Sequence, residues 1–159
     1  MGWVVAVVAG VVLVASYLTW TAKRVDRLHA RAAAAFAALD AQSVRRAAAA
    51  AELGDRENMA DAQVAARMVL AALPDDRQAA ENELTRALRL AATKFEPAEL
   101  HAVAEASRRL ALARQLYTDL VRDALAIRQR PLVRLLRLTR RHRAPTFFDI
   151  DDPTLEGTH

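Results

Sequence analysis

The hydrophobic positions of the chain change their pattern once, after Ala22. From Trp3 to Ala22 there is no charged residue, whereas from Lys23 onward apolar residues recur every three or four positions. At ~1.5 Å per residue, a helix over the first stretch is about 30 Å long, which matches the hydrocarbon core of a bilayer. The pattern predicts a transmembrane anchor over residues 1–22, followed by amphipathic helices.

The flanks of the apolar stretch favour a permanent anchor over a cleaved secretory signal. A signal carries basic residues before its apolar run, and only Met1 and Gly2 precede this one. Trp3 at one end, and Tyr17 and Trp20 at the other, lie where interfacial aromatic residues are found, so we expect them to anchor the span. A buried core helix of a soluble protein is the alternative, and it is disfavoured because apolar residues surround this helix on all sides.

Basic residues follow the apolar stretch directly and predict its orientation. They are Lys23, Arg24, Arg27 and Arg31, and the preceding side carries only the terminal amine. The positive-inside rule therefore predicts a single-pass protein of the cell (inner or plasma) membrane with most of its chain in the cytoplasm.

Four amphipathic segments predict an all-α domain over residues 23–130. They cover residues 23–53, 56–73, 77–95 and 97–130. Gly54 is expected to end the first helix as its C′ residue and Asp55 to cap the second, while Pro97 is expected to open the fourth with Glu99 in its first turn. Because the connections are short, consecutive helices should be antiparallel neighbours in a four-helix bundle.

Arg114 occupies a position on the fourth helix where the apolar stripe calls for a hydrophobic residue. One interpretation places it at the edge of the stripe, where its head reaches water. The other is a structural ion pair inside the bundle, with Asp40 as the preferred partner, because an unpaired buried arginine is very costly.

Residues 131–159 are expected to form a basic amphipathic helical segment and an acidic tail. With four antiparallel helices, the chain near Arg130 returns to the membrane face, where Arg130, Arg134, Arg137 and Arg141 share one helical row and are candidates for contact with anionic lipid head groups. The alternative is a solvated helix whose leucines pack on the bundle. In the tail, Phe147 and Phe148 are candidates for docking on the bundle.

Composition and motifs predict no catalytic, metal or cofactor site. Cysteine is absent, which removes thiolate chemistry and cysteine-based zinc sites, and the four histidines show no metal-ligand spacing. No phosphate loop or nucleophile elbow is present, and Glu81 and Glu83 are expected on a solvated helix face. We therefore expect a non-enzymatic protein without a small-molecule substrate. The net charge of +4 beside a membrane favours anionic lipid over nucleic acid as a polyanionic partner.

Three stretches of the chain carry a family resemblance. They are Phe36-Ala37-Ala38-Leu39-Asp40-Ala41-Gln42 with Arg45-Arg46; Ala80-Glu81-Asn82-Glu83-Leu84-Thr85-Arg86-Ala87-Leu88; and Arg109 to Tyr117, followed by Asp119, Val121, Pro131 and Phe147-Phe148-Asp149. In this order they resemble the LemA family. The chain departs from the family's Tyr-Asn pairs at Ala22-Lys23, Tyr117-Thr118 and Ala124-Leu125, as a divergent member would. The resemblance implies a membrane-anchored antiparallel helical bundle and no established catalytic activity.

Two functions remain open. The first is a non-enzymatic, membrane-tethered scaffold or interaction module that binds an unidentified protein partner. The alternative is a nucleic-acid-binding membrane protein that uses the Arg-rich segment 128–143, which is disfavoured because no aromatic residues interleave with its arginines for base stacking.

Overall fold

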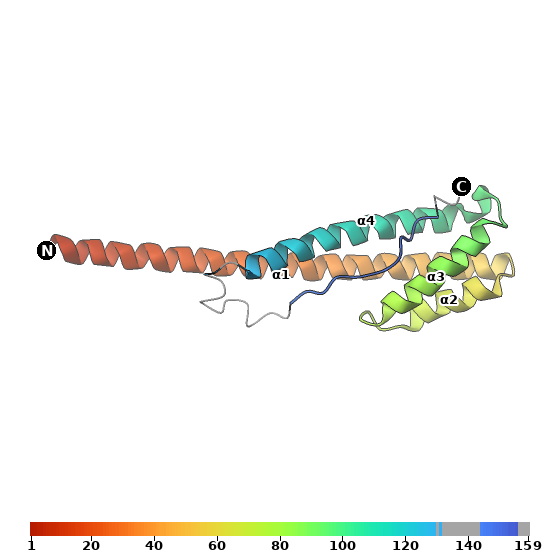
Figure 1. Ribbon diagram of the computed structural model, residues 1–159, viewed down its shortest axis with the longest axis horizontal. Coiled ribbons are helices and arrows are strands. Elements are labelled where there is room, and N and C mark those ends of the chain that lie inside the picture. Colours follow the sequence, from red (N-terminus) through yellow and green to blue (C-terminus); the bar gives the residue numbers. More distant parts are fainter. Residues whose placement is uncertain (130, 132–143, 156–159) are drawn as a thin grey trace. The chain divides into compact units, whose positions relative to one another are not determined.

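Four helices make up the regular secondary structure of the described residues. The computed structural model describes residues 1–129, 131 and 144–155, and within them it contains no strand. The helices are α1 (Gly2–Arg56), α2 (Ala60–Ala71), α3 (Arg77–Ala92) and α4 (Pro97–Arg128) (Figure 1). The predicted all-helical class is confirmed.

Helix α1 is one unbroken element of 55 residues. Its first part has no polar face, and the apolar window that satisfies the length and composition of a membrane span is 0% buried within the protein. Among the described residues it is the helix long and apolar enough to cross a bilayer. The chain up to Arg56 thus forms a single continuous helix, as the absence of Gly and Pro between Lys23 and Leu53 predicts.

The end of α1 differs from the prediction. The helix continues through Gly54 to Arg56, and the left-handed residue after it is Asn58, with φ 54°. Gly54 is instead a point of close approach, because a Cβ atom there would lie 2.9 Å from Cβ of Gln63. Asp55 does not cap α2; it accepts a hydrogen bond from the side-chain amide of Gln63, and Met59 occupies the N-cap position without a side-chain bond.

The starts of α3 and α4 agree with the local sequence signals. Helix α3 begins at Arg77 after the Pro74 turn, although Asp76 at its N-cap makes no side-chain capping bond. Helix α4 begins at Pro97, which needs no N–H donor in the first turn. Glu99 Oε2 accepts from the backbone N–H of Glu96 at 2.9 Å, as the acidic residue of a capping box does.

The chain divides into two compact units, each of which takes part of α1 and part of α4. Unit 1 contains Met1–Ala34 and Asp119–Thr146. Beyond the exposed apolar stretch, its small core is formed by Val25 of α1 and Ile127 of α4, with Leu28 packed against them.

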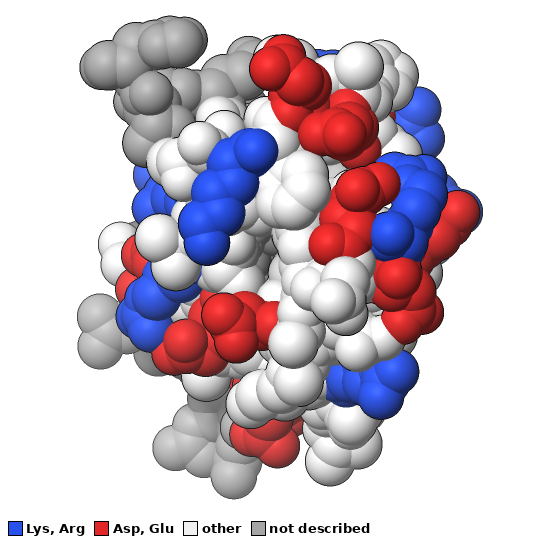
Figure 2. All heavy atoms as spheres, turned by 90° about the vertical axis from the view of Figure 1, so that its right-hand side faces the viewer, with Lys and Arg blue, Asp and Glu red and all other residues white. Residues whose placement is uncertain are grey.

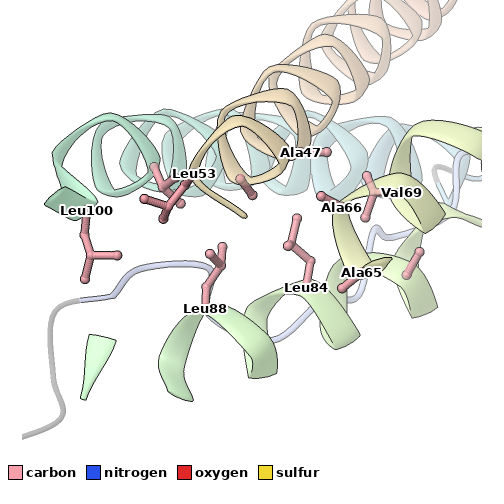
Figure 3. Close-up of a cluster of buried hydrophobic side chains, with 11 residues drawn as sticks. Ala47, Leu53, Ala65, Ala66, Val69, Leu84, Leu88 and Leu100 are labelled. Carbon is pink, nitrogen blue, oxygen red and sulfur yellow. The ribbon is translucent and has the colours of Figure 1, made fainter. Parts of the chain in front are cut away.

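Unit 2 contains Ala35–Thr118 and Phe147–His159 and holds the larger core. Side chains from all four helices point toward one another there, as Figure 3 shows for Ala47 and Leu53 of α1, Val69 of α2, Leu84 of α3 and Leu100 of α4. Helices α2 and α3 lie side by side. Alanines contribute much of this core, and since their side chains are small they allow the helix axes to approach closely.

Candidate functional site

An arginine and a glutamate lie fully buried at the centre of unit 2. Arg46 of α1 and Glu81 of α3 are both 0% exposed, and Arg46 Nη1 lies 2.5 Å from Glu81 Oε2. Arg46 follows Leu39 and precedes Leu53 by seven residues, so the helical repeat carries it along the same inward row. Glu81 is brought inward in the same way by Arg77, Leu84 and Leu88, which are also buried.

Small polar side chains and the C-terminal tail complete the hydrogen bonding of this pair. Arg46 donates from Nε to Ser107 Oγ at 3.0 Å, from Nη2 to Thr85 Oγ1 at 3.0 Å, and from Nη2 to the carbonyl of Pro153 at 3.4 Å. Ser43 Oγ donates to Glu81 Oε1. Within the described residues no buried side-chain nitrogen or oxygen lacks a partner. We call Ser43, Arg46, Glu81, Thr85 and Ser107 the buried polar cluster.

The cluster is suited to holding helices together. Burial lowers the pKa of Arg46 from its ordinary value, and the negative charge of Glu81 opposes this shift. The guanidinium is nevertheless a cation that proteins do not deprotonate, so it supplies no proton to a reaction. Its donors point at protein groups from α3, α4 and the tail, which leaves the cluster a structural role.

This cluster corrects the sequence analysis. Glu81 was expected on a solvated face, and it is instead buried opposite Arg46, while Glu83 is exposed and pairs with Arg86. The two glutamates differ because residues two apart on a helix point about 200° apart, so only one of them can face the core. A signal in the sequence could have identified the pair. Arg46 lies on the inward row of α1, Glu81 lies on the inward row of α3, and their charges are opposite.

The prediction that Asp40 pairs with Arg114 is wrong, because Asp40 pairs with a different arginine. Asp40 pairs with Arg77 at the start of α3, and Arg77 also donates to the carbonyls of Val69 at 3.1 Å and Ala72 at 2.7 Å. Arg77 thereby satisfies carbonyls at the end of α2, where no further turn of helix supplies donors. Arg114 is only partly buried, which agrees with the alternative that places it at the edge of its stripe.

The tail residues 147–155 dock on the helices of unit 2 in an extended conformation. Alternate side chains enter the protein: Phe148 and Ile150 are each 4% exposed, whereas Phe147 is 46% exposed. Phe148 meets Phe36 edge to face at 6.4 Å between ring centroids, and Phe36 in turn contacts Tyr117 at 5.5 Å. Burial raises the pKa of Tyr117, and Asp75 adds to this shift. Of the two candidate docking residues, Phe148 is the one that docks.

The backbone of the tail is held by side chains of α3 and α1. The N–H groups of Asp149 and Asp151 donate to Gln78 Oε1 at 3.2 Å and to Asn82 Oδ1 at 2.8 Å. Arg89 Nη2 donates to the carbonyl of Asp152 at 2.8 Å. Gln78 and Asn82 are one helical turn apart, and Asn82 and Arg89 are two turns apart, so one face of α3 follows the extended tail. We call Phe36, Arg46, Gln78, Asn82 and Arg89 the tail-binding surface.

The carboxylate of Asp152 is stabilised in its charged form. Hydrogen bonds from Thr154, chiefly from its backbone N–H, lower the pKa of Asp152, and the charges of Arg89 and Arg114 lower it further. Of these causes, the charges of Arg89 and Arg114 lie outside the tail, so they are the part of the shift that favours docking of the ionised acid.

The candidate anchor residues lie on the surface of α1. Trp3, Tyr17 and Trp20 are 73%, 50% and 53% exposed. Tyr17 and Trp20 lie 6.3 Å apart between ring centroids, and the guanidinium of Arg24 lies 5.6 Å from the Trp20 ring. An aromatic pair next to a cation is the arrangement found at the polar boundary of a bilayer.

In unit 1, His29 joins α1 to α4. Its Nδ1 lies 2.9 Å from the carbonyl of Val25, and its Nε2 lies 3.2 Å from Arg128 Nη1. Because a carbonyl only accepts and a guanidinium only donates, Nδ1 carries the hydrogen and Nε2 accepts. This histidine is a helix contact that sequence reasoning did not single out.

The remaining predicted site lies outside the described residues. Arg130, Arg134, Arg137 and Arg141, the candidate lipid-contacting row, are not among them. Where the chain is described, no group of three acidic, histidine or cysteine residues is placed to hold a metal ion.

Comparison of the chain with protein-family profiles, curated proteins and solved structures finds no match.

Proposed function

We propose that this protein is a membrane-anchored, LemA-like antiparallel helical bundle that acts as a non-enzymatic scaffold or interaction module for another protein at the cytoplasmic face of the cell membrane. The supporting observation is that α1 alone supplies both an exposed apolar stretch of membrane-spanning length and, from Leu39 to Leu53, the inward row of the unit 2 core. A chain built in this way ties a folded module to a lipid surface through one helix.

The contacts between α1 and α4 support the antiparallel arrangement. Phe36 contacts Tyr117, and Arg46 contacts Ser107. A residue later in α1 therefore contacts a residue earlier in α4, as in an antiparallel pair of helices. The short loops between α1, α2, α3 and α4 agree with this order of neighbours.

The residues of the LemA resemblance support the family proposal because they meet in space. Arg46, Glu81 and Phe148 come from three separate stretches, and each contributes to the buried polar cluster or to the docked tail. A resemblance by chance would not be expected to select residues that contact one another.

Exposed apolar side chains on unit 2 support a protein partner. Helix α2 exposes Val64 and Met68, one turn apart, at 57% and 51%, and α4 exposes Leu112 and Leu116, also one turn apart, at 66% and 60%. Acidic and basic side chains are interspersed with uncharged ones on the face that Figure 2 shows. Exposed apolar side chains favour a protein partner over a polyanion, and so does a surface that carries both signs of charge.

Photo-crosslinking in intact cells tests this proposal. A photoreactive residue is placed at Val64, Met68, Leu112 or Leu116, with matched controls at the exposed, charged Glu83 and Arg86 of α3. We expect a discrete protein adduct in the membrane fraction from one apolar pair and none from the controls. The same adducts from all positions, or none from a chain that fractionates with membranes, would contradict the proposal.

A further inference from the structure

The docked tail shows which kind of ligand the tail-binding surface recognises. Its contacts with Gln78, Asn82, Arg89 and Arg46 are made to the tail's backbone N–H and C=O groups, which every non-proline residue offers. Backbone contacts of this kind give affinity for an extended peptide, while the pockets for alternate side chains give specificity.

Three side chains of the tail are buried against the helices. Phe148 and Ile150 are almost fully buried, and Pro153 is buried with its carbonyl on Arg46. The residues between them, Asp149, Asp151 and Asp152, are acidic, and Arg89 and Arg114 carry the complementary charge near Asp152. The pattern is an aromatic residue, an aliphatic residue two positions later and a proline three positions after that, with acids between.

We propose that the tail-binding surface is a peptide-binding site, occupied here by the protein's own tail, and that it accepts an extended acidic segment of a partner protein with this pattern. The inference rests on the proposed function and names the chemistry of its partner. The tail then acts as an internal competitor that keeps the site closed until such a segment displaces it.

A partner segment has to compete with the protein's own tail for the site. The tail competes as part of the same chain, so its effective concentration at the site does not depend on the concentration of the protein. A partner must therefore bind more tightly than the tail does, or be concentrated beside it on the same membrane.

Peptide binding to the full-length chain in detergent micelles tests the proposal. The probe is a fluorescent peptide with the sequence of residues 145–155, Pro-Thr-Phe-Phe-Asp-Ile-Asp-Asp-Pro-Thr-Leu. In the variant Phe148→Ser/Ile150→Ser the tail should leave the site. We expect this variant to bind the probe at least tenfold more tightly than wild type does. It should not bind a probe that carries the same two substitutions.

Two matched variants locate the binding. In the tail-released background, Arg89→Ala should weaken binding of the probe several-fold, because it removes the donor to the carbonyl of the residue equivalent to Asp152. Arg86→Ala, on the same helix but paired with Glu83, should leave binding of the probe unchanged. Equal binding of both probes, or equal effects of the two arginine variants, would overturn the proposal.

A second measurement covers the case in which the tail-released variant does not fold. The chain has no cysteine, so Phe147→Cys at an exposed tail position carries a single fluorophore. Excess unlabelled peptide should lower its anisotropy as the tail is displaced, and an unchanged anisotropy at saturating peptide would overturn the proposal. A wild-type dimer that this peptide dissociates would also overturn it, since a second copy would then be the occupant. Crosslinked partners at Val64 or Leu112 without peptide binding would reject this inference and retain the proposed function.

Discussion

Arg46 and Glu81 form an ion pair that is shielded from water on all sides; Arg46 also donates to Thr85 and Ser107, and Glu81 also accepts from Ser43. Removing one partner of such a pair leaves an uncompensated charge inside the protein, which typically costs about 3–5 kcal/mol. We therefore expect the pair to contribute to the placement of α3 against α1, and the first prediction tests its contribution to stability.

Glu81→Gln should destabilise the protein by about 3–5 kcal/mol, because Arg46 loses its counter-charge in a site without water. Guanidinium unfolding of the full chain in micelles, followed by circular dichroism, measures this change. Glu83→Gln is the matched control on the same helix, and it should cost within about 0.5 kcal/mol because its partner Arg86 is exposed.

The double variant Arg46→Met/Glu81→Leu tests whether the stability lost in Glu81→Gln comes from the unpaired charge of Arg46. Replacing both charges by apolar groups of similar volume is often neutral or stabilising. We expect it to recover most of the stability that Glu81→Gln loses. A Glu81→Gln protein within about 1 kcal/mol of wild type would contradict the burial of the pair.

The double-mutant cycle of Asp40 and Arg77 should show a coupling free energy, and the cycle of Asp40 and Arg114 should not. Side chains in one ion pair have interaction energies of about 0.5–3 kcal/mol in a double-mutant cycle, whereas separated sites add within about 0.5 kcal/mol. The cycle with Asp40→Asn and Arg77→Met should fall in the first range, and that with Asp40→Asn and Arg114→Met in the second. A larger coupling to Arg114 would reverse the partner assignment.

Gly54→Ala should destabilise unit 2. The added methyl would lie 2.9 Å from Gln63 Cβ and 3.1 Å from its backbone nitrogen, so backbone has to move, at a cost of about 1–3 kcal/mol. Gly10→Ala is the control, because a Cβ there meets nothing within 4 Å. Thermal unfolding that is equally unaffected by both changes would argue against the close approach.

Acidification should loosen the tail. The pKa of Asp152 is lowered in the folded protein, so its charged form stabilises the docked tail above the ordinary carboxyl range, and this contribution is lost as the pH falls through the lowered value. Carboxyl chemical shifts measured by NMR should show Asp152 titrating below the ordinary range of an aspartate, and Thr154→Ala should move this titration upward. A titration unchanged by Thr154→Ala would remove the side-chain hydroxyl as a cause.

The sequence predicted the features that depend on neighbouring residues. Pro97 opens α4 because its missing N–H is tolerated only in the first turn, and the charge-free stretch after Trp3 forms a helix without a polar face. These signals act over a few residues, so a reader of the sequence can use them directly.

The features that depend on distant residues were missed. Gly54 is a residue type that commonly ends helices, yet its role is set by Gln63 on another helix. Asp40 could have met any nearby arginine, and spacing along one helix cannot choose between Arg77 and Arg114. Arg46 and Glu81 were missed because inward rows were traced only through apolar residues.

The proposed function depends on the proposed membrane span and on its proposed orientation, and a single introduced cysteine tests both. The cysteine-free chain allows Leu112→Cys on the exposed face of unit 2, probed in cells with a maleimide that does not cross membranes. We predict that the chain stays in the membrane pellet after carbonate extraction, and that the introduced thiol reacts only after the cells are permeabilised. A full-length chain in the soluble fraction, or labelling in intact cells, would contradict the account.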